Sequence, residues 1–196
     1  MAADEAVHWR EVLDFWFGPP GSPERGRPRK AWFEKSDAFD ALARDRFIST
    51  HAAAHSGALD AWRRTPLAAL ALVIALDQFP RNIFRGDARA FASDARALDV
   101  ARELVDRGFD AAMLPVERCF AYLPFEHAED LAAQRRALEL FARLGPDPWS
   151  ATTLDYARRH HEVIARFGRF PHRNAILGRA STPEELAFLQ QPGSSF

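Results

Sequence analysis

The feature that most constrains the fold is an apolar run of ten residues, "LAALALVIAL" at Leu67–Leu76. Thr65 and Pro66 precede it, a residue type that caps helices followed by proline at the first helical position. Ten apolar residues make half a membrane span, so the run predicts a helix buried inside a protein core. Pro80 is expected to end this helix at Phe79, because proline donates no hydrogen bond and disfavours helical geometry in the residue before it.

The rest of the sequence also favours helices. Alternating runs of β-branched residues are absent, whereas amphipathic stripes recur: Trp9, Val12, Leu13 and Trp16 lie at i, i+3, i+4 and i+7. Further helices are predicted from Ser36 to Gly57 with Phe39, Leu42, Phe47 and Ile48 facing inward, at Ala88–Arg107, from Pro115 to Pro124, at Glu126–Leu144, at Trp149–Phe167, and after a capping box formed by Thr182 and Glu185.

These elements predict an all-α fold of about eight helices, without a β-sheet. Their connections are mostly short, and short connections favour antiparallel neighbours, so we expect stacked helical hairpins. Sixteen Phe and five Trp in 196 residues supply ample apolar surface for a core. We therefore expect one helical domain over residues 1–196.

Charge and cysteine content exclude several classes of function. The net charge of −1 gives no general reason to expect binding to nucleic acid or to an anionic membrane. Cys119 is the one cysteine, which excludes an internal disulfide framework and a site with several thiolate ligands, and it is expected in the core. The N-terminal stretch lacks the basic-then-apolar order of a signal peptide, so a cytoplasmic protein is predicted. Only Lys30 and Lys35 are lysines, so a basic site would use guanidinium groups, which suit carboxylate and phosphate.

Two similar segments place polar side chains after Phe-Pro: "DQFPRNIFRG" at Asp77–Gly86 and "GRFPHRNAILGR" at Gly168–Arg179. One interpretation is structural, because Arg and Asn can cap the carbonyls at a helix C-terminus. The other is functional: if both segments lie at the same end of the helical stack, they converge on an anion or a carboxylate. The ligand-binding candidates are Gln78, Arg81 and Asn82 from the first segment and Arg169, His172, Arg173 and Asn174 from the second.

A third polar run, "VERCFAYLPFEHAEDLAAQ" at Val116–Gln134, adds acid–base candidates. Glu117, Glu126 and His127 are candidate catalytic residues, and Asp130 is a candidate ligand-binding residue. Acids in a first helical turn also favour the helix dipole, and Glu117 with Arg118 can form a structural ion pair, so the run has a purely structural interpretation too. In the later pair His160-His161, His161 is preferred because it precedes the second Phe-Pro segment on the same helix side.

Standard metal and enzyme signatures are missing. There is no Glu-x-x-His pair on two helices, no His-Glu-x-x-His, no Gly-x-Ser-x-Gly, no phosphate-binding glycine loop and no dinucleotide fingerprint. We therefore predict no metal and no cofactor. The metal alternative that stays open is an irregular site drawn from Glu117, Glu126, His127, Asp130 and His161.

Five words, "VLDFWFG", "LDQFPRNIFRG", "YLPFEHAEDL", "RFGRFPHRNAILGR" and "STPEELAFL", resemble the bacterial domain-of-unknown-function family 924, over nearly the whole chain from Val12 to Leu189. The resemblance implies a tetratricopeptide-like helical fold. The activity of the family is unassigned, so no catalytic residue is carried over. Ala128 stands where the family's usual serine is expected. The recurrent words fall on Gln78, Pro80, Arg81, Asn82, Glu117, Glu126, His127, Glu129, Asp130, Arg169, Pro171, His172, Arg173 and Asn174.

Two classes of function follow from these candidates. The first is a binding module whose groove, lined by Arg, Asn, Glu and His, holds a small anionic metabolite or a peptide carboxylate. The alternative is a small-molecule hydrolase or lyase in the same pocket, with Glu126 or Glu117 as base, His127 or His161 as proton shuttle, and the arginines as anion clamp. A structural scaffold that acts through partners is a third reading, and the oligomeric state stays open.

Overall fold

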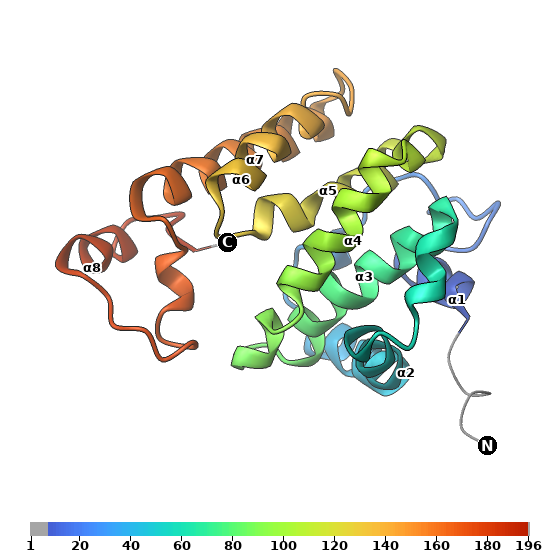
Figure 1. Ribbon diagram of the computed structural model, residues 1–196, viewed down its shortest axis with the longest axis horizontal. Coiled ribbons are helices and arrows are strands. Elements are labelled where there is room, and N and C mark those ends of the chain that lie inside the picture. The colour runs from blue at the N-terminus through green and yellow to red at the C-terminus, as the bar shows by residue number, and fades with distance from the viewer. Residues whose placement is uncertain (1–7, 196) are drawn as a thin grey trace.

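The computed structural model describes residues 8–195, and the start of the N-terminal stretch on which the cytoplasmic prediction rests lies outside them. The described part contains eight α-helices, five short 3-10 helices and no strand (Figure 1). The all-α prediction is confirmed, whereas the tetratricopeptide-like label stays a prediction. The α-helices are α1 Trp9–Phe17, α2 Asp37–Ser56, α3 Pro66–Ile83, α4 Asp94–Asp106, α5 Pro115–His127, α6 Leu131–Phe141, α7 Pro148–Phe167 and α8 Pro183–Leu189.

Helix α3 is the centre of the fold. Every side chain from Leu70 to Leu76 is fully buried, as the apolar run predicts. Helices α1, α2, α4 and α5 pack against α3, and α6 and α7 pack against each other and against α5. A smaller apolar cluster around Val163, Ile164 and Phe170 belongs to the C-terminal part, which lies beside the α3–α4 part in Figure 1. No helix in residues 8–195 has the length and apolar character needed to cross a membrane.

The prediction that Pro80 ends the central helix is wrong, because α3 continues through Pro80 to Ile83. Proline cannot donate to the carbonyl four residues earlier, which belongs to Leu76. The buried Ser93 hydroxyl donates to this carbonyl instead, at 2.5 Å. His51 Nδ1 also donates to the neighbouring Ala75 carbonyl, at 2.9 Å. Donors from other helices thus satisfy the turn before Pro80, and the helix gains the turn that carries Arg81.

Replacing Ser93 with alanine should lower the free energy of unfolding by about 1–3 kcal/mol, because the buried Leu76 carbonyl loses its donor. In a Pro80→Ala background the loss should be smaller, since residue 80 then has an N–H that can donate to the same carbonyl. Urea denaturation of the four variants in this double-mutant cycle measures the coupling. An equal loss in both backgrounds would contradict the explanation.

Three further predicted boundaries are wrong. Pro124 lies inside α5, which runs to His127, and the predicted helix Glu126–Leu144 is interrupted between α5 and α6. Asp130 caps α6 by accepting from the Ala133 N–H at 2.7 Å. The predicted helix at 88–107 is divided into a 3-10 turn, Ala88–Phe91, and α4. Glu126 therefore lies in the last turn of a helix and not in the first turn of one.

The ends of α2, α7 and α8 confirm the local signals. Ser36 caps α2 and Gly57 ends it, and Thr182 and Glu185 form the predicted capping box of α8. Helix α7 ends at Phe167, as predicted. The inward face assigned to α2 is partly wrong, because Leu42 and Ile48 are exposed.

Candidate functional site: a buried charged network

A set of charged and histidine side chains meets where the C-terminal part of the chain faces α3, α4 and α5. They come from five elements: α3, α4, α5, α7 and the 3-10 turn Pro171–Arg173. We call this set the charged network; it consists of Asp77, Arg81, Asp94, Glu126, His127, His160 and Arg173.

Asp77 is the centre of the network and is fully buried. Its Oδ1 contacts His127 Nδ1 at 2.8 Å and Arg81 Nη1 at 3.3 Å, and its Oδ2 accepts from Gln78 at 2.5 Å. Burial favours the neutral acid, but the charges and donors of Arg81, His127 and Gln78 outweigh it and lower the pKa of Asp77. The ionised carboxylate thus holds a guanidinium and an imidazole side by side on one oxygen.

Asp94, the first residue of α4, joins the two arginines. Arg81 donates to both of its oxygens, at 2.8 and 3.0 Å, and Arg173 Nη1 donates to Oδ2 at 3.2 Å. The Arg173 guanidinium also lies over the rings of Phe91 and Phe170, at 4.6 and 4.5 Å from their centroids. One carboxylate therefore serves two guanidinium groups that come from the two similar Phe-Pro segments.

Arg173 is the least compensated charge of the network. Only 6% of the residue is exposed, and its Nε has no hydrogen-bond partner within residues 8–195. Burial, together with the positive charge of Arg81, lowers the pKa of Arg173 to about 10. The group is still cationic at neutral pH, so a buried positive charge holds unused donor capacity.

The other half of the network is neutral at pH 7. Burial, together with the negative charge of Asp77, raises the pKa of Glu126 to about 8. Burial lowers the pKa of His160 to about 3 and that of His127 below its ordinary value. His160 Nδ1 lies 3.1 Å from Glu126 Oε1 and 2.9 Å from the Tyr156 carbonyl. The Glu126–His160 contact is thus a contact between neutral groups and not an ion pair.

The turn that carries Arg173 is held in place by a second set of ion pairs. Glu129 accepts from the Phe170 N–H at 2.7 Å and from Arg179 at 2.6 and 2.9 Å. Arg169 donates to Glu185 at 2.6 and 2.8 Å. These contacts tie residues 169–179 to the α5–α6 connection and to α8, and so they fix the position of Arg173.

The structure brings four predicted site residues together: Arg81, Glu126, His127 and Arg173. Gln78 and His172 flank them; Gln78 donates to Asp77, and burial lowers the pKa of the half-buried His172 to about 4. The expected convergence of the two Phe-Pro segments is therefore met by their arginines.

The remaining candidates lie elsewhere. Asn82 donates to Asp40 at 2.7 Å, and Asn174 bonds to Ser181 and Glu185. Glu117 pairs with Arg25 at 2.5 Å and caps the N-terminus of α5, so the ion pair expected with Arg118 is wrong. The predicted site residues that lie outside the network are Asn82, Asn174, Arg169, Asp130, Glu117 and His161.

The preference for His161 over His160 is wrong, because His160 is the histidine that contacts Glu126. The His160 ring packs against Phe170 at 5.4 Å between centroids, whereas His161 is half-buried beside it. His160 belongs to the buried stripe of α7 with Ala157 and Ile164, at helical spacing, and this stripe is the sequence signal that could have identified it.

Besides His160, sequence reasoning missed two network residues, Asp77 and Asp94. Asp77 lies four residues before Arg81, the spacing of a helical ion pair, but that signal has meaning only if the helix continues through Pro80. Asp94 follows Ser93, a typical helix start, but the predicted helix begins at Ala88 and hides it. Asp77 was missed because the predicted helix ended before Pro80, and Asp94 was missed because the predicted helix began at Ala88.

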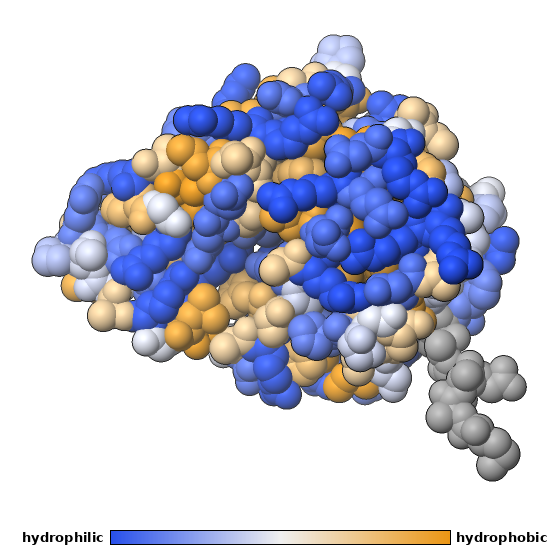
Figure 2. Space-filling view, in the orientation of Figure 1, coloured by the Kyte–Doolittle hydropathy of each residue, from blue (hydrophilic) through white to orange (hydrophobic). Residues whose placement is uncertain are grey.

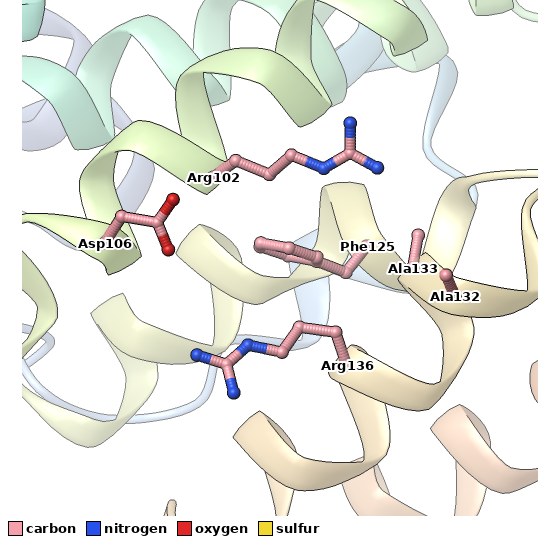
Figure 3. Close-up of a pocket in the computed structure, with 6 residues that line it drawn as sticks. All are labelled: Arg102, Asp106, Phe125, Ala132, Ala133 and Arg136. Atoms are coloured by element: carbon pink, nitrogen blue, oxygen red, sulfur yellow. The ribbon is translucent and has the colours of Figure 1, made fainter.

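Two surface pockets lie away from the network. One, of about 280 Å³, lies between α4, α5 and α6, where Arg102 and Arg136 extend on either side of Phe125 (Figure 3). The other, of about 470 Å³, lies between α7 and residues 188–193. We favour the network as the functional site, because its groups are largely buried and bonded to one another, and because the pKa values of Asp77, Glu126 and His160 are displaced. These properties mark functional sites more often than exposed charges do.

The network is partly exposed to solvent. The side chains of Arg81, Asp94 and His127 are 20%, 17% and 15% exposed, whereas Asp77 is completely covered. Figure 2 shows the surface hollowed between α4 and the C-terminal part that carries α8.

Within residues 8–195 no three His, Cys, Asp or Glu side chains are grouped so that they could hold a metal ion. The residues of the irregular metal alternative are divided: Glu117 lies at one end of α5 and Glu126 at the other, and Asp130 caps α6.

Known proteins give a family and a fold but no activity. The family model for bacterial proteins of unknown function (DUF924) matches residues 12–193. A solved structure of a protein of unknown function from Agrobacterium tumefaciens is 44% identical, with a TM-score of 0.81 over 93% of this chain and 96% of that chain. The search of curated proteins gave no match.

Proposed function

Because the chain belongs to the DUF924 family of bacterial proteins, whose function is unknown, we propose a function from the charged network itself. The protein binds a small metabolite or a peptide end through a carboxylate or phosphate group, held by Arg81 and Arg173. The observation that carries this proposal is the buried Arg173 guanidinium, which makes one hydrogen bond and has an Nε without a partner in residues 8–195.

The setting of Arg173 suits anion recognition. A guanidinium presents five N–H donors in a rigid fork that matches a carboxylate or phosphate. Phe91 and Phe170 flank the Arg173 group and fix its plane, so a ligand does not have to order it. An anion that accepts from its unused donors would satisfy a buried polar group, and such hydrogen bonds to a charged group are stronger than neutral ones.

Asp94 supports the same proposal. Its carboxylate accepts from both arginines and is partly exposed, so it occupies the position that a ligand carboxylate would take. A ligand anion would therefore share or replace contacts that Asp94 makes. The arginines are already placed around a carboxylate before any ligand arrives.

Arg173→Gln should abolish the thermal stabilisation that anions give to the wild-type protein. The probes are inorganic phosphate, succinate, citrate and a short peptide with a free C-terminus, in a thermal-shift assay. A ligand at 100 times its Kd stabilises by about 2.7 kcal/mol, so a shift is measurable. Without ligand, the variant should lose no more than about 1–2 kcal/mol of stability, because Arg81 still pairs Asp94.

Arg85→Gln is the matched control. Arg85 lies just beyond α3, four residues after Arg81, but pairs with Asp40 outside the network, at 2.6 Å. This variant should keep the anion-induced shift. If no probe stabilises the wild type, or if Arg173→Gln keeps the shift, the proposed anion site is wrong and Arg173 is structural.

The alternative, a hydrolase or lyase, is favoured by a specific observation. Glu126 and His127 are neighbours in the buried network, one holding its proton above neutral pH and the other neutral at pH 7. Two titratable groups whose environments displace their pKa values from the ordinary range in opposite directions are typical of an acid–base pair. Each group is also held in place by a neighbour, Glu126 by His160 and His127 by Asp77.

A further inference from the structure

His127 differs from the other acid–base groups of the network in its accessibility. Its Nδ1 contacts Asp77, whereas its Nε2 has no hydrogen-bond partner within residues 8–195. The His127 side chain is 15% exposed, but those of Glu126 and His160 are only 5% and 6% exposed. Among these three groups, His127 has the most exposed side chain.

Asp77 fixes the form in which His127 meets a substrate. The ionised Asp77 carboxylate accepts a proton-bearing nitrogen, so the neutral imidazole carries its hydrogen on Nδ1 and its lone pair on Nε2. A buried carboxylate that accepts from one imidazole nitrogen leaves the lone pair on the other nitrogen, which can then accept a proton. Asp77 is thus a positioning residue for a base at Nε2.

Arg81 adds a positive charge beside this base. Arg81 Nη1 and His127 Nδ1 both contact Asp77 Oδ1, at 3.3 and 2.8 Å, so the guanidinium lies next to the imidazole. A fixed cation next to a base can stabilise an oxyanion that develops during reaction. Cys119 is buried and burial raises its pKa well above the ordinary value, so water is the available nucleophile and not this thiol.

We propose that His127 is a general base for the hydrolysis of esters that carry a carboxylate, the carboxylate being held by Arg173. This inference rests on the proposed anion site. Nε2 takes a proton from water while the water oxygen attacks the ester carbonyl carbon. The C–O bond to the alcohol then breaks, and the imidazolium returns the proton to the departing oxygen. One ester and one water give one acid and one alcohol, and Arg81 stabilises the intermediate oxyanion.

The experiment compares 4-acetoxybenzoate with its neutral analogue, methyl 4-acetoxybenzoate, using the full chain and following release of the phenol by absorbance. We expect kcat/KM to be at least about tenfold higher for the anionic ester. His127→Gln should lower kcat for that ester by about 100-fold or more, the scale of a lost general base. His161→Gln, a half-buried histidine on α7 outside the network, should stay within about twofold of wild type.

The pH profile distinguishes a base from a structural histidine. Burial lowers the pKa of His127 below its ordinary value of 6.5, so the rate should fall at a lower pH than it would for a base that is an ordinary histidine. Circular dichroism and thermal melts confirm that His127→Gln folds. Turnover of neither ester above the buffer rate, or unchanged turnover in His127→Gln, would overturn the proposal.

The two proposals fail in different ways. If anions stabilise the wild type but not Arg173→Gln, and neither ester is hydrolysed, the anion site stands and the hydrolytic role of His127 is wrong. If both esters are hydrolysed equally fast with dependence on His127, the carboxylate-bearing substrate class is overturned, whereas the anion site stands or falls with the thermal-shift result.

Discussion

Asp77→Asn is expected to lower the free energy of unfolding by about 3–5 kcal/mol, the cost of removing one partner from a buried charge pair. Asp77 is completely buried and accepts from Gln78, Arg81 and His127. Without its charge, Arg81 keeps the Asp94 carboxylate, which Arg173 also uses, and the Asp77 backbone carbonyl. Urea denaturation followed by circular dichroism measures the loss.

Asp87→Asn is the matched control for this prediction. Asp87 also pairs with an arginine, Arg89 at 3.0 Å, but both side chains are on the surface. Exposed ion pairs contribute little, so its unfolding curve should be indistinguishable from that of the wild type. Similar losses in the two variants would show that Asp77 is not the centre of a buried network.

Glu126→Gln is expected to remove a loss of stability at alkaline pH. The pKa of Glu126 is about 8 in the folded protein because of burial, against an ordinary value of 4.5. Between these values the folded state holds a proton that the unfolded state has released, so stability falls as pH rises. The wild type should lose about 2 kcal/mol between pH 6.5 and pH 8 from this group. Glutamine copies the protonated acid in shape and neutrality, so the variant should be flat over this window.

The acid side has the opposite sign. Burial lowers the pKa of His160 to about 3 and that of His172 to about 4, so the unfolded state binds more protons below pH 6.5 and stability falls there. Glu126→Gln should steepen this acid limb between pH 4.5 and 6.5, because it removes the opposite trend of Glu126, and should leave the limb unchanged below pH 4.5. Glu139→Gln, at an exposed pair with Arg136, is the control and should leave the alkaline limb unchanged. An alkaline limb that persists in Glu126→Gln would contradict the assignment.

Much of the fold could be predicted from the sequence because its signals are local. Ser36 and Gly57 bound α2, and Thr182 with Glu185 opens α8, because capping depends on residues within one turn of each helix end. The apolar run Leu67–Leu76 required a buried helix, and α3 is that helix. These elements form wherever the local chemistry is satisfied, so a single sequence is enough to predict them.

The candidate site was predictable only in part. Arg81 and Arg173 were recognised because their segments repeat Phe-Pro with arginine, and Glu126 and His127 because they stand in a dense polar run. Asn82 stands beside Arg81 in the sequence, yet consecutive residues of a helix point about 100° apart. Arg81 therefore meets Asp94, whereas Asn82 meets Asp40.

By itself, then, the sequence determined the helices, their caps and the apolar centre, together with the supply of arginines near Phe-Pro. The tertiary structure decided which of these side chains meet. The Ser93 hydroxyl, from outside α3, satisfies the Leu76 carbonyl and lets the helix pass Pro80, and this added turn places Arg81 above Asp77 and beside Asp94. The local rule that proline ends a helix cannot predict this result, because the donor that replaces the missing N–H belongs to Ser93, which only folding brings close to Leu76.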